Sequence, residues 1–391
     1  TLGLHQSIKV FQTPKTLMQQ SKILDKNPNK KISYMRMALN LAEKGLGQTS
    51  PNPCVGAIVV KNDKVVGAGY HLKAGEHHAE VMAINEAGKL AQDADLYVTL
   101  EPCNHHGRTP PCAELIVKTG FRNVFIACKD PNPLVSGKGI EYLKSKNIEV
   151  EQGILEGEAV NLNKGFFKRI KEKKPFITIK VASSIDGNTS LKSGESKWIT
   201  SEYAREDVQK LRANVCAILT GVGTVNQDNP NLNVRNREHH KQPKRFILDS
   251  HLSIKSDLSI LQQDNVFIVY GDDPDNNFDS LIKTKAKLVK IPLRNNQINL
   301  SSFVSHLDEY GINNLLVEAG PKLTASLIEA GYYDDLVIYI APILLGSDAN
   351  NLVKLTQIKN IRQKIQFSFE DIRQIGPDLR VTLRAKKNDL N

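Results

Sequence analysis

The sequence contains no long hydrophobic run. Its longest apolar stretch, residues 336–345, includes Pro342, whereas a helix that spans a bilayer needs about 20 consecutive apolar residues. We therefore expect neither a membrane span nor a membrane partner. The first residues also lack the apolar core and the small-residue cleavage site of a secretory signal, which favours a cytoplasmic location.

Cysteine is scarce, with five residues among 391. Small secreted domains that depend on disulfides carry a dense and usually even set of cysteines. The low, odd number therefore favours reduced thiols and a reducing compartment. Aromatic residues are also few, at 6% with a single tryptophan, whereas proteins that bind single-stranded nucleic acid stack bases on aromatic rings.

The excess of basic over acidic residues is confined to two segments. The 52 basic residues exceed the 42 acidic ones by ten, and residues 1–31 and 164–174 each carry a net charge of +5, which accounts for the whole excess. The rest of the chain is near neutral, whereas a nucleic-acid interface needs a basic surface. We expect a small-molecule substrate and no nucleic-acid partner. We also expect a homo-oligomer.

The length predicts two domains, because a single hydrophobic core stops growing at about 250–300 residues. Helical and strand patterns alternate along both halves, as in α/β folds with helices on the faces of a sheet. A basic helical stretch over residues 156–173 is followed by Pro175 and then by a new strand pattern. We expect an N-terminal extension (1–31) that is dispensable to the fold, a first domain (32–174) and a second domain (175–391).

The predicted elements of the first domain are a hairpin over residues 54–69, helices over 34–44, 78–90, 111–119 and 139–145, and strands over 96–100, 124–128 and 148–151. The predicted strands of the second domain cover residues 176–181, 217–220, 245–249, 266–270, 288–291, 315–318, 336–341, 366–375 and 379–385. The late strands indicate a mixed sheet that closes with an antiparallel hairpin.

Metal-binding residue types cluster in the first domain. Five of the ten histidines fall between residues 71 and 106, and the order His78-Ala79-Glu80, Cys103, Cys112 lies in the same region. One imidazole and two thiolates give zinc three ligands and leave a fourth position for water, as in catalytic zinc sites. Zinc lowers the pKa of that water toward 7. Glu80 is placed to move its proton to the departing group.

Two alternatives compete with this interpretation. Isolated cysteines are usually core residues, whereas the ordered His-x-Glu and Pro-Cys elements favour metal ligation here. A structural zinc site would need a fourth protein ligand, for which the chain offers His77, His105, His106 and Cys54. The carboxyl group of Glu80 argues against a purely structural site.

These motifs resemble those of the cytidine-deaminase-like fold, with one difference in spacing. Deaminases of nucleic acids have two residues between the paired cysteines, whereas eight residues, 104–111, intervene here. Together with residues 50–56 and 75–80, this pattern is similar to that of the bifunctional riboflavin-biosynthesis deaminase/reductase family. The resemblance implies a diamino-pyrimidinone ribosylamine 5′-phosphate as substrate, His78, Cys103 and Cys112 as zinc ligands, Glu80 as acid/base, and Asn52 as a base contact.

The second half resembles the reductase part of the same family in residues 182–187, 194–200 and 317–321. The resemblance implies a dihydrofolate-reductase-like fold that uses NADPH to reduce the ribosyl group to ribityl. It places seven residues at the cofactor: Ala182, Trp198, Thr200, Thr224, Asp228, Ser250 and Gly320. It places five at the substrate, with the two arginines on its 5′-phosphate: Ser196, Arg212, Leu232, Arg235 and Glu318.

The residues themselves support a phosphate site in this half. A strand over 315–319, the turn Gly320-Pro321 and a helix over 323–330 would aim unpaired N–H groups at an anion. The Gly-x-Gly-x-x-Gly pattern of a Rossmann site is absent after the strands. Lys180 and Asp228 are candidate proton donors to the reduced ribose.

The sequence leaves two other functions as alternatives. One is a nucleic-acid or nucleoside deaminase fused to an unrelated reductase-like domain, and the other is a zinc-stabilised binding module without catalysis. The near-neutral composition and Glu80 favour an enzyme with two active sites that acts on a small molecule.

Overall fold

The computed structural model describes residues 30–105, 110–133, 135–235 and 241–386. Most of the predicted N-terminal extension, the candidate ligand His106 and residues 236–240 therefore lie outside the described residues. The described chain forms two compact units, the first ending at Phe167 and the second beginning at Lys168.

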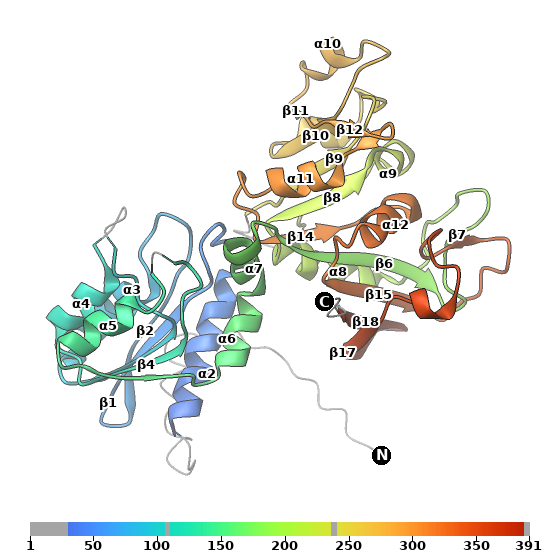
Figure 1. The fold of residues 1–391 in the computed structure, drawn as a ribbon. Coiled ribbons are helices and arrows are strands. Elements are labelled where there is room, and N and C mark those ends of the chain that lie inside the picture. Colours follow the sequence, from blue (N-terminus) through green and yellow to red (C-terminus); the bar gives the residue numbers. More distant parts are fainter. Residues whose placement is uncertain (1–29, 106–109, 134, 236–240, 387–391) are drawn as a thin grey trace, which may run out of the picture. The chain divides into compact units, whose positions relative to one another are not determined.

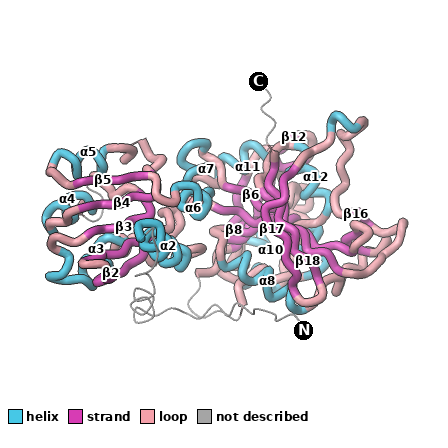
Figure 2. The backbone as a smooth tube through the Cα atoms, turned by 90° about the horizontal axis from the view of Figure 1, so that it is seen from below, coloured by secondary structure: helices cyan, strands magenta, loops and turns pink. Residues whose placement is uncertain are grey.

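The first unit contains a five-stranded mixed sheet in the order β2-β1-β3-β4-β5, and Figure 2 shows β5, β4, β3 and β2 stacked in sequence. β1 is antiparallel to both β2 and β3, whereas β3, β4 and β5 run parallel. Its strands are β1 (Gly56–Lys61), β2 (Lys64–Tyr70), β3 (Asp95–Leu100), β4 (Asn123–Cys128) and β5 (Glu149–Gln152). The predicted hairpin is confirmed, and its turn residues Asn62 and Asp63 adopt positive φ values.

Helices cover both faces of this sheet (Figure 1). One face packs on α3 (Ala79–Ala87), α4 (Cys112–Thr119) and α5 (Lys138–Ser145). The other face packs on α2 (Lys30–Ala42) and α6 (Glu156–Leu162). The central strands are buried on both sides and consist of continuous apolar residues such as Ile58-Val59-Val60.

The close packing of α3 on β2 depends on two glycines. A Cβ atom added at Gly69 would lie 2.5 Å from the carbonyl oxygen of Ala79, and one at Gly67 would lie 2.2 Å from that of Ala83. No side chain fits these contacts, so the absence of Cβ atoms lets the backbone of α3 lie directly on the strand.

The predicted helical stretch over residues 156–173 consists of two helices, α6 and α7 (Lys164–Glu172), which are separated by Asn163. The buried carboxamide of Asn163 bonds to the backbone of Cys54: the N–H of Cys54 donates to Oδ1 (2.7 Å), and Nδ2 donates to the carbonyl of Cys54 (2.8 Å). These two side-chain bonds tie the junction of the two helices to the loop that carries Asn52.

The second unit is built on a nine-stranded sheet in the order β11-β10-β9-β8-β14-β6-β15-β18-β17. Figure 1 shows β8, β14, β6 and β15 side by side at its centre. Its strands are β6 (Phe176–Ser184), β8 (Ala217–Gly221), β9 (Lys244–Leu248), β10 (Val266–Tyr270), β11 (Lys287–Lys290), β14 (Asn314–Val317), β15 (Asp335–Ala341), β17 (Phe367–Ile375) and β18 (Asp378–Ala385). The seven strands from β11 to β15 across the sheet run parallel, and β18 and β17 complete the sheet as an antiparallel pair. The predicted mixed sheet with a closing hairpin is confirmed.

Helices again cover both faces of the sheet. α11 (Leu300–His306) and α12 (Pro321–Glu329) pack on one face. The other face packs on α8 (Glu202–Ala213), α9 (Val222–Asp228) and α10 (Phe278–Leu281). The remaining strands are short: β7 (Asn188–Ser190) with β16 (Asn350–Asn351), and β12 (Leu293–Arg294) with β13 (Gln297–Ile298).

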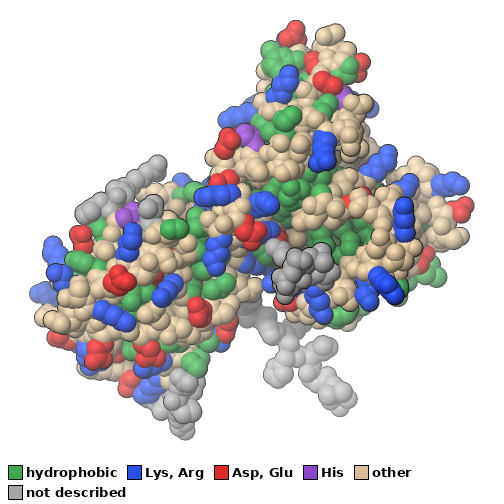
Figure 3. Space-filling model, viewed as in Figure 1, with side chains coloured by type: hydrophobic (Ala, Val, Ile, Leu, Met, Phe, Trp, Pro, Cys, Tyr) green, Lys and Arg blue, Asp and Glu red, His purple; other side chains and the backbone are tan. Residues whose placement is uncertain are grey.

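Charged side chains are mixed on the visible surface. Figure 3 shows Lys and Arg interspersed with Asp and Glu over both units, without a single basic patch on this face. Within the described ranges, no helix has the length and apolar character needed to cross a membrane. None of the five cysteines forms a disulfide.

Two glycine substitutions test the close contact between β2 and α3, one at the contact and one away from it. We expect them to have opposite effects on the free energy of unfolding. Gly69→Ala is expected to destabilise the protein by about 1–3 kcal/mol, because the new methyl group would collide with backbone. Gly157→Ala, in an exposed position of α6 with no atom near the new methyl group, is expected to stabilise it by up to about 1 kcal/mol. Urea unfolding measures both values. Equal effects of the two substitutions would contradict the close contact.

Candidate functional site

The structure brings His78, Cys103 and Cys112 together. Their ligand atoms all lie within 4.8 Å of one another, and no other such group of three occurs among the residues that the structure describes. Nδ1 of His78 lies 3.2 Å from Sγ of Cys112 and 3.7 Å from Sγ of Cys103. His77, His105 and Cys54 do not join this group, so none of them supplies the fourth ligand of a structural site.

Two helix starts and one strand end meet at this point. His78 is the N-cap of α3, Cys112 is the first residue of α4, and Cys103 follows the end of β3. The N–H of Cys112 donates to Sγ of Cys103 (3.3 Å), and the N–H of Ala113 donates to the carbonyl of Cys103 (3.1 Å). Cys103 therefore caps α4, whose N-terminus favours negative charge on the sulfur.

The electrostatics of the three groups suit a metal ion. The hydrogen bonds from Cys112 and the facing His78 lower the pKa of Cys103 to about 4 despite its partial burial. The neighbouring Cys103 and burial raise the pKa of Cys112. Two sulfurs and one imidazole nitrogen are the donor set of catalytic zinc sites, and a divalent cation would offset the cost of a second thiolate. The residues present therefore fit zinc.

Glu80 lies in the first turn of α3, two residues after His78, and is only 4% exposed. Burial raises the pKa of its carboxyl group to about 7, although the nearby His78 opposes the shift. A carboxyl group with a pKa near neutrality can both accept and return a proton at physiological pH.

Asn52 is held by a residue that the sequence analysis did not select. Nδ2 of Asn52 lies 3.0 Å from Nε2 of His71, and Nδ1 of His71 lies 3.0 Å from the carbonyl oxygen of His77. A carbonyl only accepts, so Nδ1 of His71 carries the proton and Nε2 accepts from the amide of Asn52. Burial lowers the pKa of His71 and keeps its ring neutral. The histidine cluster was the sequence signal that could have identified it.

Three charged side chains meet on the α8 face of the second unit. Lys180 lies on β6, Arg212 on α8, and Glu318 follows β14. Nε and Nη2 of Arg212 donate to the two carboxylate oxygens of Glu318 (2.6 and 3.0 Å), and Nζ of Lys180 lies 3.9 Å from the same carboxylate. Burial would raise the pKa of Glu318, but Arg212 and Lys180 hold it below its usual range. Burial lowers the pKa of Lys180.

The two arginines predicted to bind a phosphate differ in their surroundings. Arg212 is largely buried, and its Nη1 also donates to the carbonyl of Asn233 (3.2 Å). Arg235 is exposed, and Leu232 is buried with a positive φ value of 49°. The main difference from the sequence prediction is that Arg212 and Glu318 bind each other, which spacing along the chain could not reveal.

Three of the candidate cofactor residues, Thr224, Ser250 and Gly320, follow the carboxyl ends of parallel strands, where α/β sheets bind ligands. The predicted strand, turn and helix around Gly320 are confirmed, with Gly320 as N-cap of α12 and Pro321 in its first turn. A Cβ atom added at Gly320 would lie 3.6 Å from Oγ1 of Thr224, so these two residues are close neighbours. Ser250 follows β9, and its Oγ accepts the N–H of Ile298 (3.2 Å).

The remaining candidates lie in different surroundings. Trp198 is 71% exposed, and the guanidinium of Arg205 lies 4.4 Å from its ring centroid. Nη1 of Arg205 also donates to the carbonyl of Thr200 (2.8 Å). Ala182 on β6, Asp228 at the end of α9 and Ser196 are partly exposed. The described contacts do not join all of these residues into one cluster.

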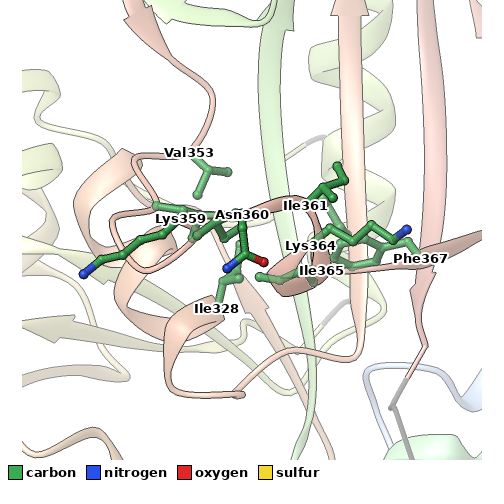
Figure 4. A pocket seen from close by; sticks show the side chains of 11 residues that line it. Ile328, Val353, Lys359, Asn360, Ile361, Lys364, Ile365 and Phe367 are labelled. Atoms are coloured by element: carbon green, nitrogen blue, oxygen red, sulfur yellow. The ribbon is translucent and has the colours of Figure 1, made fainter.

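The second unit also contains an apolar pocket of about 470 Å³. Figure 4 shows that its walls come from Ile328, Val353, Ile361, Ile365 and Phe367, with Lys359, Asn360 and Lys364 also along its lining. None of the candidate site residues lines it. This pocket is therefore separate from the group around Arg212 and Glu318.

Two family models match the chain. Residues 28–128 match the cytidine and deoxycytidylate deaminase zinc-binding region, and residues 175–381 match the RibD C-terminal domain. The riboflavin biosynthesis protein RibD of Bacillus amyloliquefaciens is 46% identical over 90% of this chain and 96% of its own length. RibD of Escherichia coli (strain K12) is 42% identical over 88% of this chain and 97% of its own length.

Solved structures give the same result. Acinetobacter baumannii RibD (form 2) has a TM-score of 0.84 at 40% identity and matches over 92% of this chain and 99% of its own. A Thermotoga maritima protein has a TM-score of 0.82 at 32% identity, with the same coverage of 92% and 99%. It is described as a diaminohydroxyphosphoribosylaminopyrimidine deaminase/5-amino-6-(5-phosphoribosylamino)uracil reductase.

The pairing of Arg212 with Glu318 predicts that substitution of the arginine lowers the stability of the second unit. Arg212→Ala is expected to destabilise the second unit by about 3 kcal/mol, because it leaves the largely buried Glu318 carboxylate without its bidentate partner. The double variant Arg212→Ala, Glu318→Gln removes that uncompensated charge and is expected to recover part of the loss. Urea unfolding of the three proteins tests this, and an Arg212→Ala variant as stable as wild type would contradict it.

Proposed function

The chain belongs to the RibD family of bifunctional riboflavin-biosynthesis enzymes, and from this premise we propose which of its residues carry each reaction. It is a zinc-dependent pyrimidine deaminase joined to an NADPH-dependent reductase. Its fold combines a cytidine-deaminase-like domain with a dihydrofolate-reductase-like domain. We assign deamination to residues 32–174 and reduction to residues 175–391.

For the first reaction, we propose the substrate that the description of the Thermotoga maritima relative indicates. It is 2,5-diamino-6-ribosylamino-4(3H)-pyrimidinone 5′-phosphate. His78, Cys103 and Cys112 would hold zinc, and the distances among their ligand atoms are the single observation that carries this assignment. The chemistry that zinc supplies there is the ionisation of a water molecule near neutral pH.

Glu80 moves the protons of this reaction. In the buried site its carboxylate accepts the proton of the attacking water and then delivers it to the departing amino group, for which a pKa near 7 is suitable. Asn52 contacts the pyrimidine base. The bond from its Nδ2 to His71 fixes the direction in which its carboxamide faces.

In the second reaction, the ribosyl chain of the deaminated product is reduced to ribityl, which yields 5-amino-6-ribitylaminouracil 5′-phosphate; NADPH would supply the hydride. We propose that Gly320 and Thr224 contact a cofactor phosphate at the N-terminus of α12. The exposed ring of Trp198 would contact the cofactor from one side. The other proposed cofactor contacts are Ala182, Thr200, Asp228 and Ser250.

On the substrate side, Arg235 and the remaining donors of Arg212 would bind the 5′-phosphate, with Ser196 and Leu232 as further contacts. Glu318, oriented by Arg212, would accept hydrogen bonds from the ribose hydroxyls. Lys180, whose pKa burial lowers, is the better placed of the two candidate proton donors, because it shares a face with Glu318.

The substrate is a small molecule, and we propose that the enzyme acts in the cytoplasm as a homo-oligomer. The reduced state of the zinc-binding thiolates supports that location, because zinc binds deprotonated, unoxidised sulfur.

Substitution of the acid/base residue tests the first assignment. Glu80→Gln is expected to retain zinc, since Glu80 is not a ligand, and to lower ammonia release roughly 10²- to 10⁴-fold through loss of proton transfer. Zinc content and ammonia are measured in the same preparation, with reduction of the deaminated intermediate as the control. Turnover within about tenfold of wild type would exclude this role.

Product analysis tests the division of labour between the two units. Incubation of the purified protein with the diamino-pyrimidinone phosphate should release ammonia without NADPH and should yield the ribityl product only with NADPH. After zinc removal with a chelator, the first step should stop while the supplied deaminated intermediate is still reduced. Mass spectrometry follows both steps, and loss of both activities on chelation would show that the assignment of separate sites is wrong.

A further inference from the structure

A buried carboxylate that neither reaction uses lies beside the proposed metal centre. Glu101 is 3% exposed and follows β3 directly, two residues before Cys103. Its Oε1 accepts the N–H groups of Gly139 (3.0 Å) and Ile140 (3.3 Å). Its Oε2 accepts those of Gly137 (2.9 Å) and Asp130 (3.3 Å). Four backbone donors therefore converge on one side chain.

These donors belong to the start of α5 and to the loop that follows β4. α5 begins at Lys138, and its own N-cap, Gly137, has no side chain to bind the first N–H groups. Glu101 supplies the missing cap from another element, and its negative charge faces the positive end of the helix. Hydrogen bonds to a charged acceptor are roughly twice as strong as neutral ones.

The segment that carries Cys103 is fixed to α5 on both sides of the cysteine. On one side, Glu101 binds the first turn of α5, and its own N–H donates to the carbonyl of Cys128 (3.0 Å). On the other side, Nδ2 of Asn104 donates to the carbonyl of Lys138 (3.3 Å). Between them, a Cβ atom added at Gly139 would lie 2.1 Å from the carbonyl oxygen of Pro102. The ligand segment and the helix are therefore in direct backbone contact.

We propose that Glu101 is a positioning residue of the metal centre. By binding the start of α5 to residues 101–104, it holds Sγ of Cys103 in place against His78 and Cys112. This inference rests on the proposed role of Cys103 as a zinc ligand. The segment has no helix or strand of its own, so its path depends on these bonds together with those of Cys103 to the start of α4. Groups that orient metal ligands typically change metal affinity or activity 10- to 100-fold when they are removed.

The decisive variant is Glu101→Gln, which keeps the size of the side chain but replaces one acceptor oxygen with an NH₂ group that faces N–H donors. The full-length protein is titrated with zinc in competition with a chromophoric chelator. We expect zinc binding to weaken about 10- to 100-fold, with reduction of the deaminated intermediate unchanged. Zinc dissociation should also be faster than in wild type.

Asp95→Asn is the matched control. Asp95 begins the same strand, β3, and accepts hydrogen bonds from Arg122 (3.0 Å) and Asn123 (2.8 Å) at the end far from Cys103 along the strand. Its substitution is expected to lower stability without changing zinc affinity by more than about twofold, because it does not hold a ligand-bearing segment. Thermal unfolding of both variants separates stability from metal affinity.

Each outcome of these zinc titrations either supports or overturns the positioning role of Glu101. If Glu101→Gln binds zinc as tightly as wild type, or if both variants lose the same affinity, Glu101 has only a structural role and the proposal is wrong.

If Glu101→Gln does not fold, Glu101→Asp takes its place in the titration. The aspartate retains the charge but is too short to reach all four donors. It should weaken zinc binding less than full removal of the support, about three- to tenfold against the 10- to 100-fold of complete loss, and wild-type affinity would overturn the proposal. If wild type itself binds no stoichiometric zinc, the ligand assignment fails instead.

Discussion

The deaminase unit depends on one contact between a strand end and a helix start. Sγ of Cys103 accepts the first N–H of α4, from Cys112, and the carbonyl of Cys103 accepts the next. This contact brings two sulfurs together although eight residues separate them along the chain. It also provides the positive environment in which a thiolate is stable. The close packing of α3 on the glycines of β2 then sets where His78 and Glu80 face the two sulfurs.

Three buried or largely buried glutamates show how surroundings determine the role of the same side chain. Glu80 has few compensating partners, so burial raises its pKa to about 7 and suits it to proton transfer. Glu318 faces Arg212 and Lys180 and stays ionised. Glu101 accepts four backbone N–H groups and serves to hold the chain in place. Residue type alone does not distinguish these three roles.

The two units share a simple design. In each, the proposed site residues follow the carboxyl ends of parallel strands or lie at the starts of the helices that come next: Cys103 after β3 and Cys112 in α4, Glu318 after β14 and Gly320 at α12. This is the edge at which a parallel sheet leaves backbone donors and loop side chains available to a ligand. The sheet thus provides a rigid support, and the loops provide the chemistry.

The sequence by itself determined the α/β alternation, the closing hairpin and the set of residues proposed as metal ligands, because periodicity and residue types can be read along the chain. The spacing between Cys103 and Cys112 also distinguished the family. The tertiary structure alone decided the pairing of Arg212 with Glu318, the bond from Asn52 to His71, the break at Asn163 and the four bonds to Glu101. Each of these joins residues that are distant in the chain, and each depends on burial, which the order of residues does not specify.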